Sequence, residues 1–152
     1  MSNTYEVVKD VRIKATPETI FPFFTDPEKM VQWKGTSVDL DAKPGGVYRC
    51  LVQGQHQAAG EYVTVDPPHR VVFTFGWEVE GNPIAPGSTT IEITLTPDGD
   101  ETVVKLRHYG LPDEKACVDH GIGWQHYLDR LAIASTGGDA GPDVNGPDGA
   151  HA

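Results

Sequence analysis

The chain has 152 residues, of which 38% are hydrophobic, a length and composition that suit one domain with one core. Its formal charge of −10, from 12 basic and 22 acidic residues, gives a negative field that repels phosphate backbones and anionic membrane surfaces. We therefore expect no nucleic-acid partner and no membrane partner.

The cysteines and the first residues of the chain give an expectation for the cellular compartment. Cys50 and Cys117 lie far apart and outside any CxxC or Cys/His spacing, so the sequence supports neither a disulfide framework nor a structural zinc site. We expect both to be reduced thiols in the core. No apolar run approaches the roughly 20 residues that cross a bilayer, and the start MSNTYEVVKD lacks a secretory pattern. A cytoplasmic, soluble protein is the expectation.

The first part of the chain predicts a strand followed by two short helices. Residues 5–15, YEVVKDVRIKA, are rich in β-branched side chains with partial alternation. Thr16 can cap a helix that starts with proline, and Asp26 repeats the same start signal. The two helices carry Phe24 and Trp33 among their apolar side chains.

Six more strands follow, because the hydrophobic period changes to two. They are expected over residues 36–42, 47–52, 60–65, 70–77, 89–95 and 102–109. Alternation places Phe73, Phe75 and Trp77 together on one buried face. By the same pattern Tyr48 and His108 point inward from their own strands.

The last predicted element is a long amphipathic helix from about residue 112 to 135, with an apolar stripe through Cys117, Trp124, Leu128 and Leu131. From Thr136 onward the chain is crowded with Gly, Pro and Asp, so residues 1–135 should form the domain and 136–152 a disordered tail. Strands joined by short turns, with a single long helix, indicate an antiparallel sheet covered on one face, an α+β fold.

Five stretches follow one another along the chain in a distinctive order. They are VRIKATPETIF (11–21), DPEKMVQW (26–33), PGGVY (44–48), GEYVTVDPPHRVVFTF (60–75) and the helical GW at 123–124. In this order and spacing they resemble the START-like, or SRPBCC, superfamily over residues 5–135. The resemblance is to the branch similar to the C-terminal domain of the activator of heat-shock protein 90 ATPase.

This resemblance implies the helix-grip fold: a curved antiparallel sheet of about seven strands, two short helices after the first strand, and a long C-terminal helix gripped by the sheet. Superfamily members include ligand carriers, polyketide cyclases, resistance proteins and co-chaperone-like modules. The fold by itself therefore does not select a function.

The implied fold gives a role to Gly121 and Gly123, each of which costs roughly 1 kcal/mol against alanine within a helix. Glycines on the inner helical face either let a strand approach or leave space, so we expect a ligand pocket there. The side chains expected to line it are Phe24, Trp33, Tyr48, Phe73, Phe75, Trp77, His108, His120 and Trp124, with Glu61 as a further inward candidate. The alternative is that these aromatic residues only fill a core.

Candidate catalytic residues are restricted to His108, His120 and Tyr48. Either histidine could act as a general base near neutral pH, or each could be a hydrogen-bonded structural residue. The sequence shows no nucleophile-elbow motif, no cysteine beside a plausible base and no carboxylate pair at strand ends. Nucleophilic catalysis is therefore disfavoured.

The remaining histidines do not predict a metal site. His120 and His126 are six positions apart, which turns them to different sides of a helix. His56, His69 and His151 fall in expected turns or in the tail. We expect no metal and no other cofactor.

Three functions remain open. The leading one is a non-enzymatic protein that binds a small hydrophobic or aromatic molecule, lipid-like or polyketide-like, between the helix and the sheet. The second is an enzyme resembling polyketide cyclases, with a pocket histidine or tyrosine moving a proton. The third is a protein-interaction domain resembling the chaperone activator. The loop EGNPIAPGS (80–88) is either a plain connector or a gate over the pocket, with Ile84 at its tip.

Overall fold

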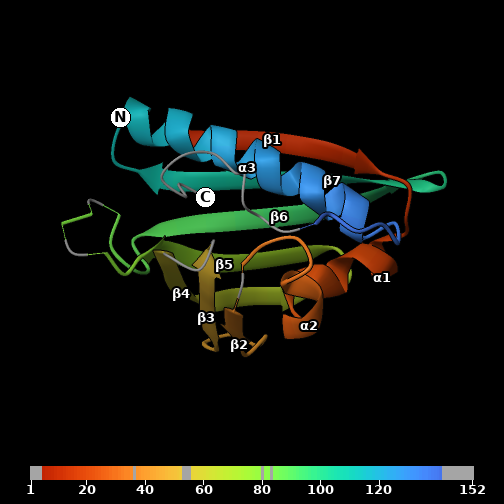
Figure 1. The fold of residues 1–152 in the computed structure, drawn as a ribbon, viewed down its shortest axis with the longest axis horizontal. Helices are drawn as coiled ribbons and strands as arrows, with labels where there is room; N and C mark the ends of the chain where they lie inside the picture. The colour runs from red at the N-terminus through yellow and green to blue at the C-terminus, as the bar shows by residue number, and fades with distance from the viewer. Residues whose placement is uncertain (1–4, 36, 53–55, 80, 83, 142–152) are drawn as a thin grey trace.

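A single sheet grips one long helix in the computed structural model, which describes residues 5–35, 37–52, 56–79, 81–82 and 84–141 (Figure 1). The elements in chain order are β1 (Tyr5–Ile13), α1 (Pro17–Ile20), the 3-10 turn η1 (Phe21–Phe24), α2 (Pro27–Met30), β2 (Ser37–Leu40), β3 (Val47–Val52), β4 (His56–Asp66), β5 (Arg70–Trp77), β6 (Thr89–Asp98), β7 (Glu101–Leu111) and α3 (Glu114–Ala134). This order confirms the predicted α+β helix-grip fold.

The sheet has seven strands in the order β1-β7-β6-β5-β4-β3-β2, and every neighbouring pair is antiparallel. From β2 to β7 the chain forms a meander, while β1 crosses to pair with the last strand, with Val7 opposite His108 and Val11 opposite Val104. The edges of the sheet are therefore β1 and β2. The helix α3 runs along β1 across one face of the sheet (Figure 1).

Short polar side chains begin each helix, as the sequence predicts. Thr16 accepts a hydrogen bond from the backbone of Thr19, and Asp26 accepts one from Glu28. At the start of α3, the carboxylate of Asp113 accepts from the backbone N–H of Ala116. These caps satisfy amide groups that have no partner within the helix, and so define where each helix starts.

The buried face of the sheet follows the predicted alternation. Phe73, Phe75 and Trp77 are all buried on β5, and Tyr48 is buried on β3. Of the two cysteine thiols, Cys50 lies in the core, whereas Cys117 is only half-buried at the margin of the core.

Two sequence predictions about β4 are wrong. The strand begins at His56, so His56 lies in a strand and not in a turn. Glu61 is exposed on the outer face, and the neighbouring Tyr62 points inward instead. The segment around Glu61 alternates weakly, and pairing with β3 and β5, including an irregularity between Tyr62 and Thr64, decides which face each residue takes.

The start of the predicted tail is held against the domain by Arg130 of α3. Its guanidinium donates to the carbonyl oxygens of Trp33, Ala140 and Gly141 at 2.9–3.0 Å. The domain boundary at 135 stays a prediction, and tail residues 142–152 lie outside the described residues. Within the part of the chain described here, no helix has the length and apolar character needed to span a bilayer.

Candidate functional site

Seven of the nine predicted pocket residues form one connected group of rings between α3 and the sheet. We call this group the ring cluster; its members are Tyr48, Phe73, Phe75, Trp77, His108, His120 and Trp124. Phe75 lies at its centre, with ring centroids 5.2 Å from both Trp77 and His108 and 6.2 Å from Trp124. All seven side chains are buried. Sheet and helix therefore bring these side chains together.

The other two predicted residues form a separate pair beside the ring cluster. Phe24 and Trp33 meet edge to face, with ring centroids 5.4 Å apart. The indole of Trp33 donates to the carbonyl of Phe23. Tyr62, which the sequence analysis did not single out, packs against Tyr48 and donates its hydroxyl hydrogen to the carbonyl of Phe24 at 2.8 Å. Tyr62 thus connects the pair to the ring cluster.

The hydrogen bonds of His108 define its tautomer. The indole N–H of Trp124 donates to His108 Nδ1 at 3.1 Å, which requires that this nitrogen carry no hydrogen. His108 Nε2 lies 2.8 Å from the hydroxyl of Thr89, and that hydroxyl donates to the carbonyl of Phe75 at 2.6 Å. Thr89 therefore accepts from Nε2, and His108 is a neutral imidazole with its proton on Nε2.

His120 is the opposite tautomer to His108. The indole N–H of Trp77 donates to His120 Nε2 at 3.2 Å. His120 Nδ1 lies 2.9 Å from the carbonyl oxygen of Ala116, one turn earlier on α3, and must donate to it. His120 is therefore also neutral, with its proton on Nδ1, and each nitrogen of both rings has a protein partner.

Burial shifts the acid–base behaviour of this group. The pKa of His108 lies well below its ordinary value of 6.5, first because burial penalises the imidazolium, and further because the ammonium group of Lys34 repels it. Burial likewise raises the pKa of the Tyr48 hydroxyl well above its ordinary value of 10.0. Near neutral pH both side chains are therefore uncharged.

Sequence reasoning missed a buried lysine next to the ring cluster. Lys34 is 1% exposed, and its ammonium nitrogen lies 4.9 Å from the ring centroid of Trp124 and 4.3 Å from that of Tyr127. Cation–π attraction of this kind stabilises an ammonium group away from water. The only signal in the sequence was the position directly after Trp33, which is not enough to predict a buried charge because lysine is almost never buried.

A small cavity opens at the end of the ring cluster. Its volume is about 180 Å³, and Trp77, His120, Ala116 and Ile84 are among its lining residues. Ile84 is itself buried at 3% exposure, and its carbonyl accepts from the backbone of Trp77. Ile84 therefore forms part of the wall beside the rings.

The chain after Ile84 is seated directly on β5. A Cβ atom at Gly76 would lie 1.7 Å from the carbonyl oxygen of Ala85, closer than any side chain permits. Only glycine lets this segment pack on the strand at that point. The part of the 80–88 loop around Ile84 and Ala85 is thus fixed against the sheet beside the cavity.

Gly121 does not face the ring cluster. A Cβ atom there would lie 3.6 Å from Lys9 Cε and 3.8 Å from Val7 Cγ1, so its space belongs to the β1 side of α3. These are ordinary contact distances.

We expect Gly121→Ala to raise the free energy of unfolding by about 0.5–1 kcal/mol, because alanine favours the helix. Urea unfolding followed by circular dichroism measures this. Gly76→Ala should instead lower the free energy of unfolding. The prediction is wrong if both variants, or neither of them, are more stable than wild type.

Within the described ranges, no group of three His, Cys, Asp or Glu side chains could hold a metal ion. His126 contacts the ring of Tyr127, and His56 packs edge to face with Trp77, so they belong to different surroundings.

Comparison with known proteins shows which families and solved structures this chain is similar to. A family model described as activator of Hsp90 ATPase homolog 1-like protein matches residues 14–135. A solved AHSA1-like protein from Rhizobium etli is 38% identical over 95% of this chain and 90% of its own, with a TM-score of 0.75. CalU16 from Micromonospora echinospora is 27% identical, with 91% of this chain and 78% of that chain covered and a TM-score of 0.72.

Another match shares the fold alone. DynU16, a protein of the dynemicin biosynthetic locus, is 22% identical, with 89% of this chain and 49% of that chain covered and a TM-score of 0.76. A comparison with curated proteins gave no match.

Proposed function

Because the chain belongs to the activator of Hsp90 ATPase homolog 1-like family, within the START-like superfamily, we propose that it binds a small hydrophobic or aromatic molecule between α3 and the sheet. The observation that carries the proposal is the small pocket that two members of the ring cluster, Trp77 and His120, line together with Ile84 and Ala116. CalU16 shares the fold, and DynU16 is a protein of the dynemicin biosynthetic locus. A planar, polyketide-like guest is the class we favour.

The size and lining of the cavity support such a guest. Its volume of about 180 Å³ is comparable with the roughly 150 Å³ of an engineered apolar cavity that accepts benzene. Trp77, Ile84 and Ala116 supply apolar surface, and the polar or charged lining residues are Asn82, Asp113, Lys115, Asp119 and His120. Ligand sites commonly combine an apolar wall with a few placed polar groups. A larger guest would require the segment around Ile84 to move aside.

The hydrogen bonds favour binding over catalysis. A general base needs an imidazole nitrogen that can accept a proton from substrate. In His108 the accepting nitrogen is engaged by Trp124, and in His120 it is engaged by Trp77. A cyclase-like reaction would have to break one of these buried bonds first. For that reason we keep the enzyme as the alternative function. In the binding proposal, His108 and His120 have structural roles.

A ligand titration tests the binding proposal. A panel of single-ring and fused two-ring aromatic compounds should shift the amide resonances of Phe75, Trp77 and Trp124 together. Ala116→Leu fills the cavity from the helix side, and we expect it to weaken the best binder by about tenfold or more. Val118→Leu, on the exposed side of the same helix, is the matched control and should leave affinity unchanged. If no compound moves the Trp77 amide, the ring cluster is only a core and the proposal fails.

The family description also names an activator of the Hsp90 ATPase. A protein-interaction role for this chain therefore remains a second alternative. It differs from ligand binding in its footprint, because a partner protein would perturb resonances outside the ring cluster. A pull-down followed by mapping of the perturbed amides distinguishes the two.

A further inference from the structure

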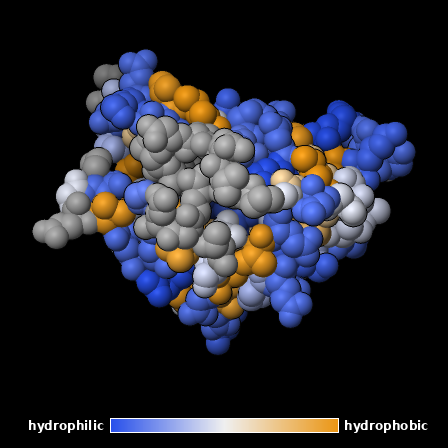
Figure 2. All heavy atoms as spheres, viewed as in Figure 1, coloured by the Kyte–Doolittle hydropathy of each residue, from blue (hydrophilic) through white to orange (hydrophobic). Residues whose placement is uncertain are grey.

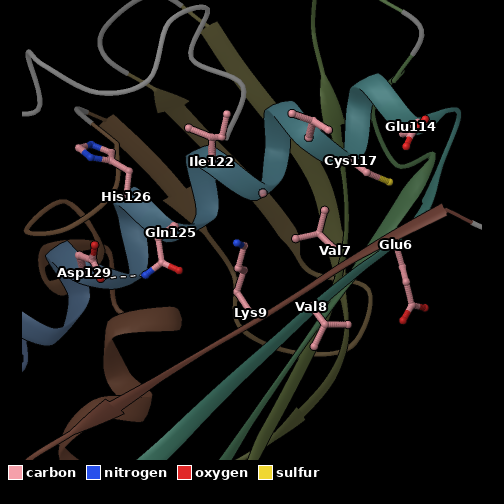
Figure 3. A pocket seen from close by; sticks show the side chains of 12 residues that line it. Glu6, Val7, Val8, Lys9, Glu114, Cys117, Ile122, Gln125, His126 and Asp129 are labelled. Carbon is pink, nitrogen blue, oxygen red and sulfur yellow. Dashed lines mark hydrogen bonds between the residues drawn. The ribbon is translucent and has the colours of Figure 1, made fainter.

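A groove runs between the edge strand β1 and the helix α3 (Figure 3). Its volume is about 900 Å³, and none of the ring-cluster side chains lines it. Val7 and Lys9 point from β1 toward the helix, where the absence of a side chain at Gly121 deepens the floor. The groove is therefore separate from the cavity assigned to the small molecule.

Large apolar side chains are exposed along this groove. Val118 and Ile122, one turn apart on α3, are 56% and 55% exposed, and Val8 at the edge of the sheet is 46% exposed. Figure 2 shows hydrophobic surface along the upper edge of the molecule, where α3 and β1 run in Figure 1. Grouped apolar surface on a protein that is otherwise strongly charged is typical of an interaction site.

The strand beside the groove can extend the sheet. β1 is 9 residues long and, among the described residues, pairs only with β7. Its outer edge therefore presents backbone N–H and C=O groups in a row, which is a template for another strand. A strand added there would run beneath the outer side of α3, with every second side chain facing Val118 and Ile122.

The charges of the groove select the partner. Three carboxylates line it, those of Glu6, Glu114 and Asp129, and the cations beside them are Lys9 and, paired with Glu6, Arg107, which leaves the groove with a net negative charge. Glu6 is paired with Arg107 at 3.0 Å, and Asp129 accepts from Gln125 at 3.0 Å (Figure 3), while the whole chain carries −10. We propose that this groove binds an extended basic peptide segment of another protein, which pairs with β1 as an additional strand and packs alternate apolar side chains on α3.

Two other occupants fit less well. A second copy pairing antiparallel about the middle of β1 would place Lys9 opposite Lys9, and both molecules would carry the same net charge of −10. The chain's own C-terminus, PDVNGPDGAHA, is rich in Pro and Gly and has no alternating apolar residues. A basic peptide meets neither difficulty.

Nuclear magnetic resonance titration tests the proposal with defined probes. The probe is a short peptide of alternating Val and Thr with Lys at both ends. We expect it to shift the β1 amides and slow their hydrogen exchange. Ile122→Gln removes the apolar contact without changing the charge and should weaken binding about tenfold or more, whereas the matched control Ile133→Gln, 45% exposed on the same helix, should not change it. A Glu-ended peptide should bind more weakly, and high salt should reduce the difference.

Three results would overturn the assignment. The first is that the Lys-ended peptide leaves the β1 amides unchanged. The second is that it binds with equal affinity to wild type and Ile122→Gln, which would place it elsewhere, such as at β2. The third is a concentration-dependent dimer in sedimentation that Ile122→Gln converts to monomer, which would make a second copy the occupant. Failure of the aromatic titration leaves this proposal untouched, because the two sites share no lining residue.

Discussion

Trp124→Ala should lower the free energy of unfolding by about 3–5 kcal/mol, a large part of the roughly 5–15 kcal/mol typical of a domain. Trp124 is 0% exposed and contacts the rings of Phe75 and His108. Removing the indole leaves a cavity in the ring cluster and also deprives His108 Nδ1 of its donor. Urea denaturation followed by circular dichroism measures the loss.

Trp124→Phe separates the two contributions. It keeps a ring against Phe75 but cannot donate to His108, so we expect a smaller loss of about 1–3 kcal/mol. Ile122→Ala, on the exposed side of the same helix, should stay within about 0.5 kcal/mol of wild type. Equal losses for Trp124→Ala and Ile122→Ala would show that the interior between helix and sheet is not packed as described.

Acid should destabilise the protein through His108. The folded state holds this imidazole neutral, because its pKa lies well below 6.5, whereas the unfolded chain takes up a proton near 6.5. Its contribution to stability is therefore complete above pH 6.5 and is lost as the pH falls below that value. Below pH 6.5 the loss approaches about 1.4 kcal/mol per pH unit, the slope for one proton taken up on unfolding.

His108→Gln isolates this effect from the protonation of carboxylates. Glutamine can accept from Trp124 and donate to Thr89 but does not titrate in this range. Urea midpoints measured from pH 7.5 to 5 should therefore fall less steeply for the variant, by about one proton's worth of slope. Parallel pH profiles for the two proteins would show that His108 is protonated in the folded state, contrary to the hydrogen bonds it makes.

Most of the fold was predictable because local patterns specify it. Phe73, Phe75 and Trp77 alternate in a run of β-branched and aromatic residues, which gives a strand and its buried face at once. Thr16, Asp26 and Asp113 sit at helix starts where their short side chains can cap amides. Glu61 was misplaced because its segment offers no clear alternation, and the facing strands decided its side.

For the candidate site, the sequence predicted which ring side chains take part but not how they contact one another. Nothing in one sequence shows that Trp124 donates to His108 or that Trp77 donates to His120, since each bond joins elements whose relative position depends on the whole sheet. Lys34 was missed for a related reason, because its burial depends on Trp124 and Tyr127 of α3 packing against it. The hydrogen-bond partners and protonation states of these side chains therefore depend on the tertiary structure, whereas the aromatic residues themselves can be read from the sequence.

The pairing of β1 with β7 sets the order in which the protein can be completed during synthesis. Residues joined across this pair, such as Arg12 with Glu101 and Glu6 with Arg107, are 89 and 101 positions apart. At a translation rate of about 5–20 residues per second, the first strand waits roughly 5–20 s for its neighbour. Lys9, Asp10 and Arg12 interrupt the valines of that waiting segment with charge, a pattern that natural sequences use to limit aggregation of hydrophobic strands.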